Sequence, residues 1–124
     1  MSFGYALKKF REERGLSLRE FAKLCDIDHA YIHRLEKDEK TAPSVDAVDT
    51  FVQNLKLNAR QTRMLRFLAG RRGLEDLVQV FLEDGARPLD TFESLAQMSF
   101  RGKRPDNKDE WRKWAERLEN MMNE

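Results

Sequence analysis

The sequence is poor in cysteine, proline and glycine, and each shortage excludes a class of protein. Cys25 is the single cysteine in 124 residues, which excludes an intramolecular disulfide and a cysteine-cluster metal site and fits a reducing compartment. Three prolines and six glycines, without a Ser- or Gln-rich tract, argue against low-complexity disorder. No apolar run approaches the roughly 18 to 20 residues that span a bilayer. The N-terminus lacks the charged and then apolar segment, followed by a cleavage site, that is typical of a signal sequence. We therefore expect a soluble, cytoplasmic protein.

Charged residues are abundant and unevenly distributed. They make up 36% of the chain, against 40% hydrophobic residues, which fits one compact domain or a small domain with an appendage. Residues 1–73 carry 15 Lys and Arg against 10 Asp and Glu, whereas residues 74–124 carry 8 against 12. This asymmetry predicts that only the basic N-terminal part faces a polyanion.

Apolar residues recur at helical spacing along almost the whole chain, and no alternating segment is long enough to compete as a strand. The pattern predicts an all-α fold. Ser17, Asp28, Ser44 and Asn58 are expected to cap helices, Ser17 in a capping box with Glu20. Helices are expected at about residues 3–14, 17–25, 30–36, 44–55, 58–69, 74–82, 89–98 and 108–122. In the fourth, the apolar face is expected to consist of Val45, Val48, Val52 and Leu55.

Two of these helices are short and separated by a tight turn, which is the geometry of a helix-turn-helix. Ala22 is small where the two helices must cross, and Ile27 is placed to fill the gap under the turn. Ile32 and Leu35 anchor the second helix, so that its other face is left free.

At these positions the sequence resembles the helix-turn-helix regulators of the xenobiotic response element type, which include the lambdoid phage repressors. The matching strings are LKKFREERGLS from Leu7, Phe21-Ala22, IDHAYIHRLE from Ile27, and Pro43-Ser44. The resemblance covers residues 5–69. It implies a five-helix lambda-repressor-like DNA-binding domain, residues 1–70, followed by a small helical C-terminal region, residues 71–124, for dimerisation or partner binding.

The resemblance also implies roles for individual residues. The third helix would enter the major groove, and the base-reading residues would be His29, Ala30, His33 and Arg34. Arg34 can pair bidentately with guanine, Ala30 can meet a thymine methyl, and His29 can donate or accept at a purine edge. The phosphate-contacting residues would be Ser17, Tyr31, Lys37 and Lys40. Arg11 and Glu36 would form a structural ion pair between the first and third helices.

The last helix carries a stripe of large apolar side chains with two interpretations. The residues are Trp111, Trp114, Leu118 and Met121. They either pack on the chain's own core or form a dimer or partner interface, where aromatic and Met residues are enriched. The basic segment before this helix, with Arg101, Lys103 and Arg104, is interpreted as a charged linker rather than a phosphate contact.

Metal and enzyme hypotheses find little support in the sequence. Cys25, His29 and His33 are spaced by four, but the turn between Cys25 and His29 breaks the helical face, so we expect no metal and no cofactor. The two histidines have no matching nucleophile, and the glycines form no phosphate-cradling loop. We therefore expect a protein that is not an enzyme.

The sequence thus predicts a homodimeric, sequence-specific DNA-binding regulator that represses a promoter from a palindromic operator on double-stranded DNA. The alternative is an antitoxin of a toxin-antitoxin pair, or a repressor controlled by a partner metallopeptidase, whose acidic C-terminal half binds the partner. A third hypothesis, an interaction protein that does not bind DNA, rests on Leu18, Asp38 and Glu39, which depart from the family pattern.

Overall fold

The computed structural model describes residues 2–37 and 42–122, and within them the chain is entirely helical and turn structure. It divides into two compact units, Met1–Gly73 and Leu74–Glu124, which are described separately below. No helix in the described parts of the chain is both long and apolar enough to cross a membrane. The all-α fold predicted from apolar periodicity is confirmed.

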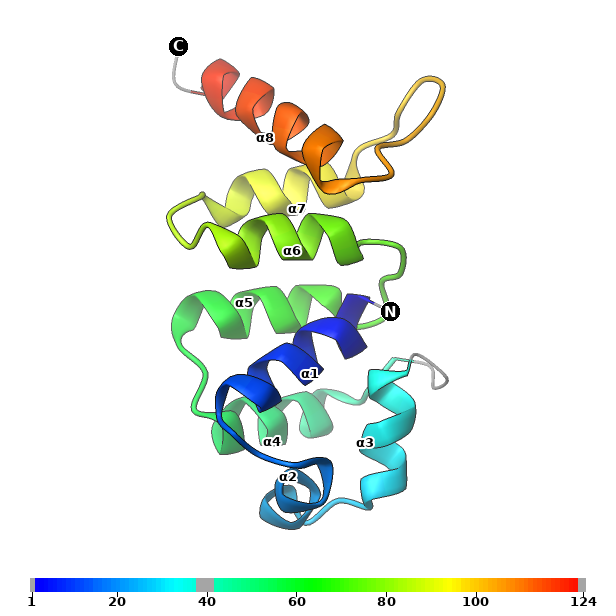
Figure 1. Cartoon of the computed structure of the whole chain (residues 1–124), viewed down its shortest axis with the longest axis vertical. Coiled ribbons are helices and arrows are strands. Elements are labelled where there is room, and N and C mark those ends of the chain that lie inside the picture. The colour runs from blue at the N-terminus through cyan, green and yellow to red at the C-terminus, as the bar shows by residue number, and fades with distance from the viewer. Residues whose placement is uncertain (1, 38–41, 123–124) are drawn as a thin grey trace. The chain divides into compact units, whose positions relative to one another are not determined.

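The first unit is a cluster of short helices around one core (Figure 1). Helix α1 packs against α3 and α5, α2 packs against α3 and α4, and α4 also packs against α5. The largest fully buried side chains in this core are aromatic and aliphatic: Phe10, Phe21, Phe51, Leu7, Ile32, Leu55, Met64, Leu65 and Leu68. The helices of its described residues are α1 (Ser2–Glu13), α2 (Leu18–Cys25), α3 (His29–Glu36), α4 (Val45–Leu55) and α5 (Ala59–Leu68).

Side-chain caps fix where these helices begin, as predicted. Ser17 Oγ accepts a hydrogen bond from the Glu20 amide at 3.1 Å, and the Glu20 carboxylate accepts one from the Ser17 amide at 3.0 Å. Asp28 caps α3 through the Ala30 amide, while Ser44 and Asn58 cap α4 and α5. Each cap satisfies an amide that the first turn of a helix leaves without a partner.

The turn between α2 and α3 depends on a left-handed residue. Asp26 ends α2 at φ 54° and ψ 44°, and its amide bonds back to the carbonyls of Ala22 and Lys23. Asp tolerates this region better than most side chains because its short polar group can bond locally. The tight turn follows from that single residue.

The apolar face predicted for α4 was wrong by part of a turn. Val45 is 73% exposed and Val52 is only half-buried, whereas Ala47, Val48, Phe51 and Leu55 form the buried face. Val45 is the first residue of the helix, and the neighbouring helices leave most of its side chain uncovered. Both the predicted set and the buried set have helical spacing. The spacing alone therefore does not show which of the two faces is buried.

The second unit is three mutually packed helices: α6 (Glu75–Glu83), α7 (Leu89–Gln97) and α8 (Lys108–Met122). Its core includes Phe81 and Phe92, whose ring centroids lie 5.3 Å apart, with Trp111 and Ala115 of α8. The segment before α8 is anchored, because Pro105 is buried and the Phe100 ring packs edge-on against the Trp111 and Trp114 rings.

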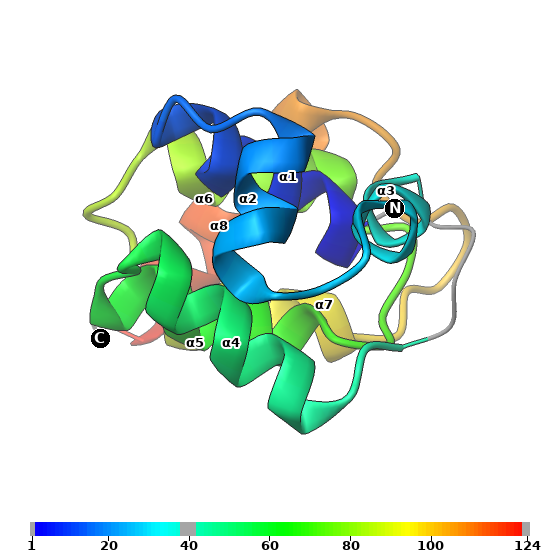
Figure 2. The same cartoon turned by 90° about the horizontal axis from the view of Figure 1, so that it is seen from below.

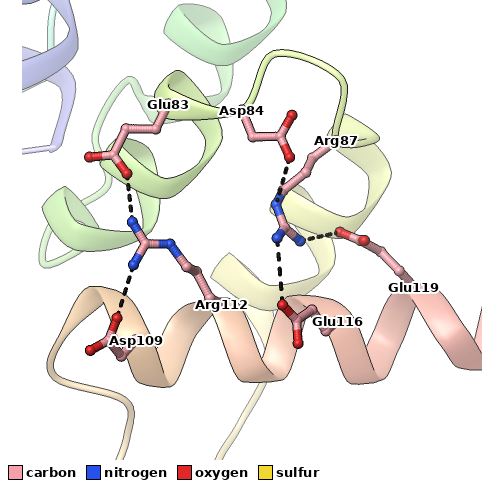
Figure 3. A network of polar contacts seen from close by, with 7 residues as sticks. All are labelled: Glu83, Asp84, Arg87, Asp109, Arg112, Glu116 and Glu119. Carbon is pink, nitrogen blue, oxygen red and sulfur yellow. Dashed lines mark hydrogen bonds and ion pairs between the residues drawn. The ribbon is translucent and has the colours of Figure 1, made fainter.

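Two arginines join α8 to the end of α6 and the loop after it (Figure 3). Arg112 binds the Glu83 carboxylate at 2.6 Å, and Lys108 binds its other oxygen at 3.0 Å. Arg87, whose side chain is 15% exposed, meets Glu119 at 2.9 Å and Asp84 at 3.4 Å. These pairs add ionic contacts between α8 and the segment from Glu83 to Arg87.

Candidate nucleic-acid interface

Helices α2 and α3 meet at a wide angle. In Figure 2, α3 is seen nearly along its axis while α2 lies across the view beside it. Ala22, 4% exposed, and the fully buried Ile32 belong to the packed sides of this pair, and Ile27 in the turn is half-buried. The packing leaves the opposite side of α3 uncovered within the described residues of its unit.

The C-terminal end of α3 is held by α1 in two ways. The Arg11 guanidinium donates to both carboxylate oxygens of Glu36, at 2.8 and 2.9 Å, and also to the carbonyl of Leu16 at 2.8 Å. Gly4 lies against the carbonyls of Leu35 and Glu36, so close that an added Cβ would stand 2.2 Å from the Leu35 oxygen. The ion pair implied by the family resemblance is therefore present, and it raises the pKa of Arg11 through the Glu36 hydrogen bond.

The outer face of α3 carries five exposed residues: His29, Ala30, His33, Arg34 and Lys37. At 100° per residue they fall on one side of the helix, with Ile32 and Leu35 on the other. All four residues predicted to read bases lie on this face. The side chain of Arg34 has no hydrogen bond or ion pair with any part of the chain that the structure describes.

A shallow groove of about 450 Å³ separates this face from the start of α2. Ser17, Leu18, Arg19, His29 and His33 line it. Arg19 was not among the predicted site residues, because only the position of α3 beside the start of α2 places it in the groove. Its guanidinium adds a positive charge beside the two histidines.

The start of α2 combines a donor with a carboxylate. Ser17 Oγ accepts from the Glu20 amide, which leaves its hydroxyl proton to donate. The hydrogen bond from the Ser17 amide holds the pKa of Glu20 below its usual value. The charge on Glu20 opposes a phosphate at this helix end, and the neighbouring Arg19 offsets it.

The other residues predicted to contact phosphates are Tyr31, Lys37 and Lys40, and the two that the structure describes differ in exposure and in position. Lys37 is exposed at the C-cap of α3 and continues its outer face. Tyr31 is half-buried and, two residues after His29, lies on the far side of the helix from it. Lys40 falls outside the described residues, as do Asp38 and Glu39. These contacts remain predictions.

The predicted interface stripe on α8 divides into a buried and an accessible part. Trp111 is 2% exposed and belongs to the core of the second unit. Trp114 and Leu118 are half-buried, and Met121 is 65% exposed. The aromatic ring of Trp114 is also covered by Arg117, whose guanidinium lies 4.7 Å from the ring centroid. The accessible part of the stripe is therefore Trp114, Leu118 and Met121.

Cys25 and the two histidines do not face one another. Cys25 is buried in α2, and desolvation raises the pKa of its thiol to about 11, while His29 and His33 are exposed on α3. Among the described residues, no three His, Cys, Asp or Glu side chains gather as metal ligands.

Comparison with known proteins agrees with this geometry. Residues 7–59 match a helix-turn-helix family model, a span that runs from α1 to the start of α5. The HTH-type transcriptional regulator DdrOP3 of Deinococcus deserti is 27% identical over 112 residues, which cover 85% of this chain and 86% of that protein. The residues matched by the family model include the Ser17 cap, the left-handed turn at Asp26 and the exposed face of α3. The N-terminal unit thus contains a helix-turn-helix domain, matched over residues 7–59.

Proposed function

We propose that the protein is a DNA-binding transcriptional regulator that uses the outer face of α3 to recognise an operator in the major groove. The observation that carries this proposal is that His29, Ala30, His33 and Arg34 are all exposed on one side of a helix whose other side is buried. Helix-turn-helix domains read bases with such a face, and nearby basic and hydroxyl side chains bind phosphates.

Fluorescence anisotropy with the purified full chain tests the proposal. The probes are duplex DNA from upstream of the gene and a scrambled duplex, each at two salt concentrations. We expect preference for the upstream duplex, affinity that falls steeply with salt because phosphate contacts release counterions, and loss of the preference in Arg34→Ala. Lys113→Ala is the control, since it removes one exposed positive charge from α8. Equal binding of both duplexes by wild type and Arg34→Ala would overturn the assignment.

We further propose that the regulator is a homodimer that represses by occupying two half-sites about one helical turn apart. What supports the dimer is the accessible stripe of Trp114, Leu118 and Met121 on α8, since exposed Met and aromatic side chains are enriched at interfaces. Repression is tested with a reporter behind the upstream DNA, whose expression should rise when the gene is deleted.

The dimer surface is tested by light scattering on Met121→Glu. Because Met121 is exposed, the substitution leaves the core intact, and we expect a monomer with weaker operator binding. Asn120→Glu is the matched control, because Asn120 is also exposed but lies away from the stripe on the same helix. A Met121→Glu variant that keeps the mass and affinity of wild type would remove α8 from the dimer interface. The stripe would then be a surface for a different protein partner.

A further inference from the structure

On the outer face of α3, Arg34 and Lys37 can only donate hydrogen bonds, whereas His29 and His33 can each donate or accept. His29, His33, Arg34 and Lys37 are exposed there, and none of them carries an amide or a carboxylate. The one carboxylate on the helix belongs to Glu36, whose two oxygens accept hydrogen bonds from Arg11 on the packed side. A base that needs an acceptor from this face would therefore depend on a ring nitrogen of His29 or His33, while Arg34 suits a base that presents acceptors.

The four bases differ in what they present in the major groove. Guanine shows two acceptors, N7 and O6; adenine shows an acceptor and a donor; cytosine shows a donor. Asn or Gln suits adenine, Glu or Asp suits cytosine, and Arg or Lys suits guanine. Arg34 is the exposed residue on α3 with two parallel donors, and within the described residues its side chain is not engaged elsewhere.

We propose that the operator half-site is specified by a guanine bound bidentately by Arg34 and by a thymine whose methyl group meets Ala30. This inference rests on the proposed DNA-binding function and names the bases that the same face reads. Ala30 and Arg34 are separated by about one helical turn of 5.4 Å. Since stacked bases are about 3.4 Å apart, the guanine and the thymine belong to base pairs one or two steps apart.

A change of specificity tests the guanine contact more sharply than a loss of binding. Arg34→Gln replaces two donors with one donor and one acceptor, which match adenine N7 and N6. Because Arg34 is exposed and not engaged, the variant is expected to fold like wild type. The experiment selects bound duplexes from a randomised pool with the full-length wild type and with Arg34→Gln, and then measures the affinity of single-base variants.

We expect the wild type to select a duplex with a guanine that cannot be replaced by adenine without losing about 5- to 150-fold in affinity, the equivalent of 1–3 kcal/mol. Replacing that guanine by 7-deazaguanine, which lacks the N7 acceptor, should weaken wild-type binding. Arg34→Gln should prefer adenine at that position and leave the preferences at other positions unchanged. Replacing the neighbouring thymine by uracil, which lacks the methyl group, should weaken binding by wild type.

The outcomes separate this inference from the proposed function. A selected duplex that Arg34→Gln binds with unchanged preferences, or that tolerates 7-deazaguanine, overturns the guanine assignment while sequence-specific binding stands. Uniform weakening on all duplexes would make Arg34 a phosphate contact and also overturn it. If the wild type enriches no sequence from the pool, the proposed function and this inference fail together.

Discussion

The guanidinium of Arg11 binds both carboxylate oxygens of Glu36, with Nε to Oε2 at 2.8 Å and Nη2 to Oε1 at 2.9 Å. The two side chains are 10% and 6% exposed, so the pair is largely shielded from water. Through Nη1 the same guanidinium also binds the carbonyl of Leu16, ahead of α2. One arginine therefore fixes α3 and the start of the helix-turn-helix relative to α1.

The first prediction follows from that shielding. Glu36→Ala leaves the Arg11 charge buried without its partner, and we expect the free energy of unfolding to fall by about 3 kcal/mol. Urea denaturation followed by far-ultraviolet circular dichroism measures the change. Glu13→Ala is the control, because Glu13 is an exposed carboxylate of α1. If the two variants unfold at the same urea concentration, the pair contributes no more than a surface charge.

The second prediction concerns Gly4. A methyl group there would stand 2.2 Å from the Leu35 oxygen and 2.8 Å from the Glu36 oxygen, both backbone atoms. Alanine favours helix by about 1 kcal/mol over glycine, but the clash requires α1 and α3 to separate, so we expect net destabilisation of about 1–3 kcal/mol.

Gly85→Ala is the control for this substitution. Apart from Gly85 itself and its two neighbours in the chain, no described atom lies within 4 Å of a Cβ placed at Gly85. Its effect should be neutral or slightly stabilising, because alanine restricts the unfolded chain. Thermal melts of the two variants decide the matter. A Gly4→Ala protein as stable as wild type would show that the close approach of α1 to α3 is not required.

The local parts of the fold could be predicted because local chemistry decides them. Ser17 with Glu20, and Asp28 with Ala30, cap helices through atoms that lie within three residues of each other. Asp26 adopts the left-handed turn for a similar reason. The periodic apolar pattern predicted the last helix at residues 108–122, which are the bounds that the structure shows.

The parts that could not be predicted depend on long-range packing. Nothing around Gly4 in the sequence shows that the carbonyls at the end of α3 will lie against it. Val45 was assigned to the wrong face because which of two helical stripes is buried depends on where α2 and α5 lie. Arg19 joins the candidate site only because α3 folds back beside it to form the groove.

The third prediction uses Cys25 as a reporter of the first unit. Burial raises the pKa of its thiol to about 11, so little thiolate exists at pH 8 and the side chain is also inaccessible. We expect alkylation by iodoacetamide in native buffer to be slower than in urea by about a hundredfold or more. The pKa of the Cys25 thiol is higher in the folded protein than in the unfolded chain. Ionisation of Cys25 therefore does not lower the free energy of unfolding while the pH is below the thiol pKa of the unfolded chain, and it lowers that free energy progressively as the pH rises from there toward 11.

Mass spectrometry after timed alkylation gives the rate, and Glu36→Ala serves as the comparison. If the Arg11–Glu36 pair holds the first unit together, that variant should be alkylated faster than wild type. Equal rates in native buffer and in urea would mean that α2 does not bury Cys25 in solution.

The fourth prediction concerns acid and the attachment of α8. Hydrogen bonds from Lys108 and Arg112 hold the pKa of Glu83 below its usual value. A lowered folded pKa means that the stabilisation is present above the unfolded value of about 4.3 and is lost as the pH falls through the folded value. We therefore expect the second unit to lose part of its stability in acid, below about pH 4.

Both tryptophans of the chain, Trp111 and Trp114, lie on α8, so their fluorescence reports the unfolding of the second unit. Thermal melts followed by tryptophan fluorescence between pH 7 and pH 3 should show a lower Tm for Glu83→Gln than for wild type at pH 7. The difference should shrink as the acid protonates Glu83 in the wild type, because the charge that binds Arg112 is then absent from both proteins. Glu13→Gln, in the first unit, should follow the wild-type curve throughout. A Tm difference that stays constant down to pH 3 would show that Glu83 stabilises α8 through packing rather than through its charge.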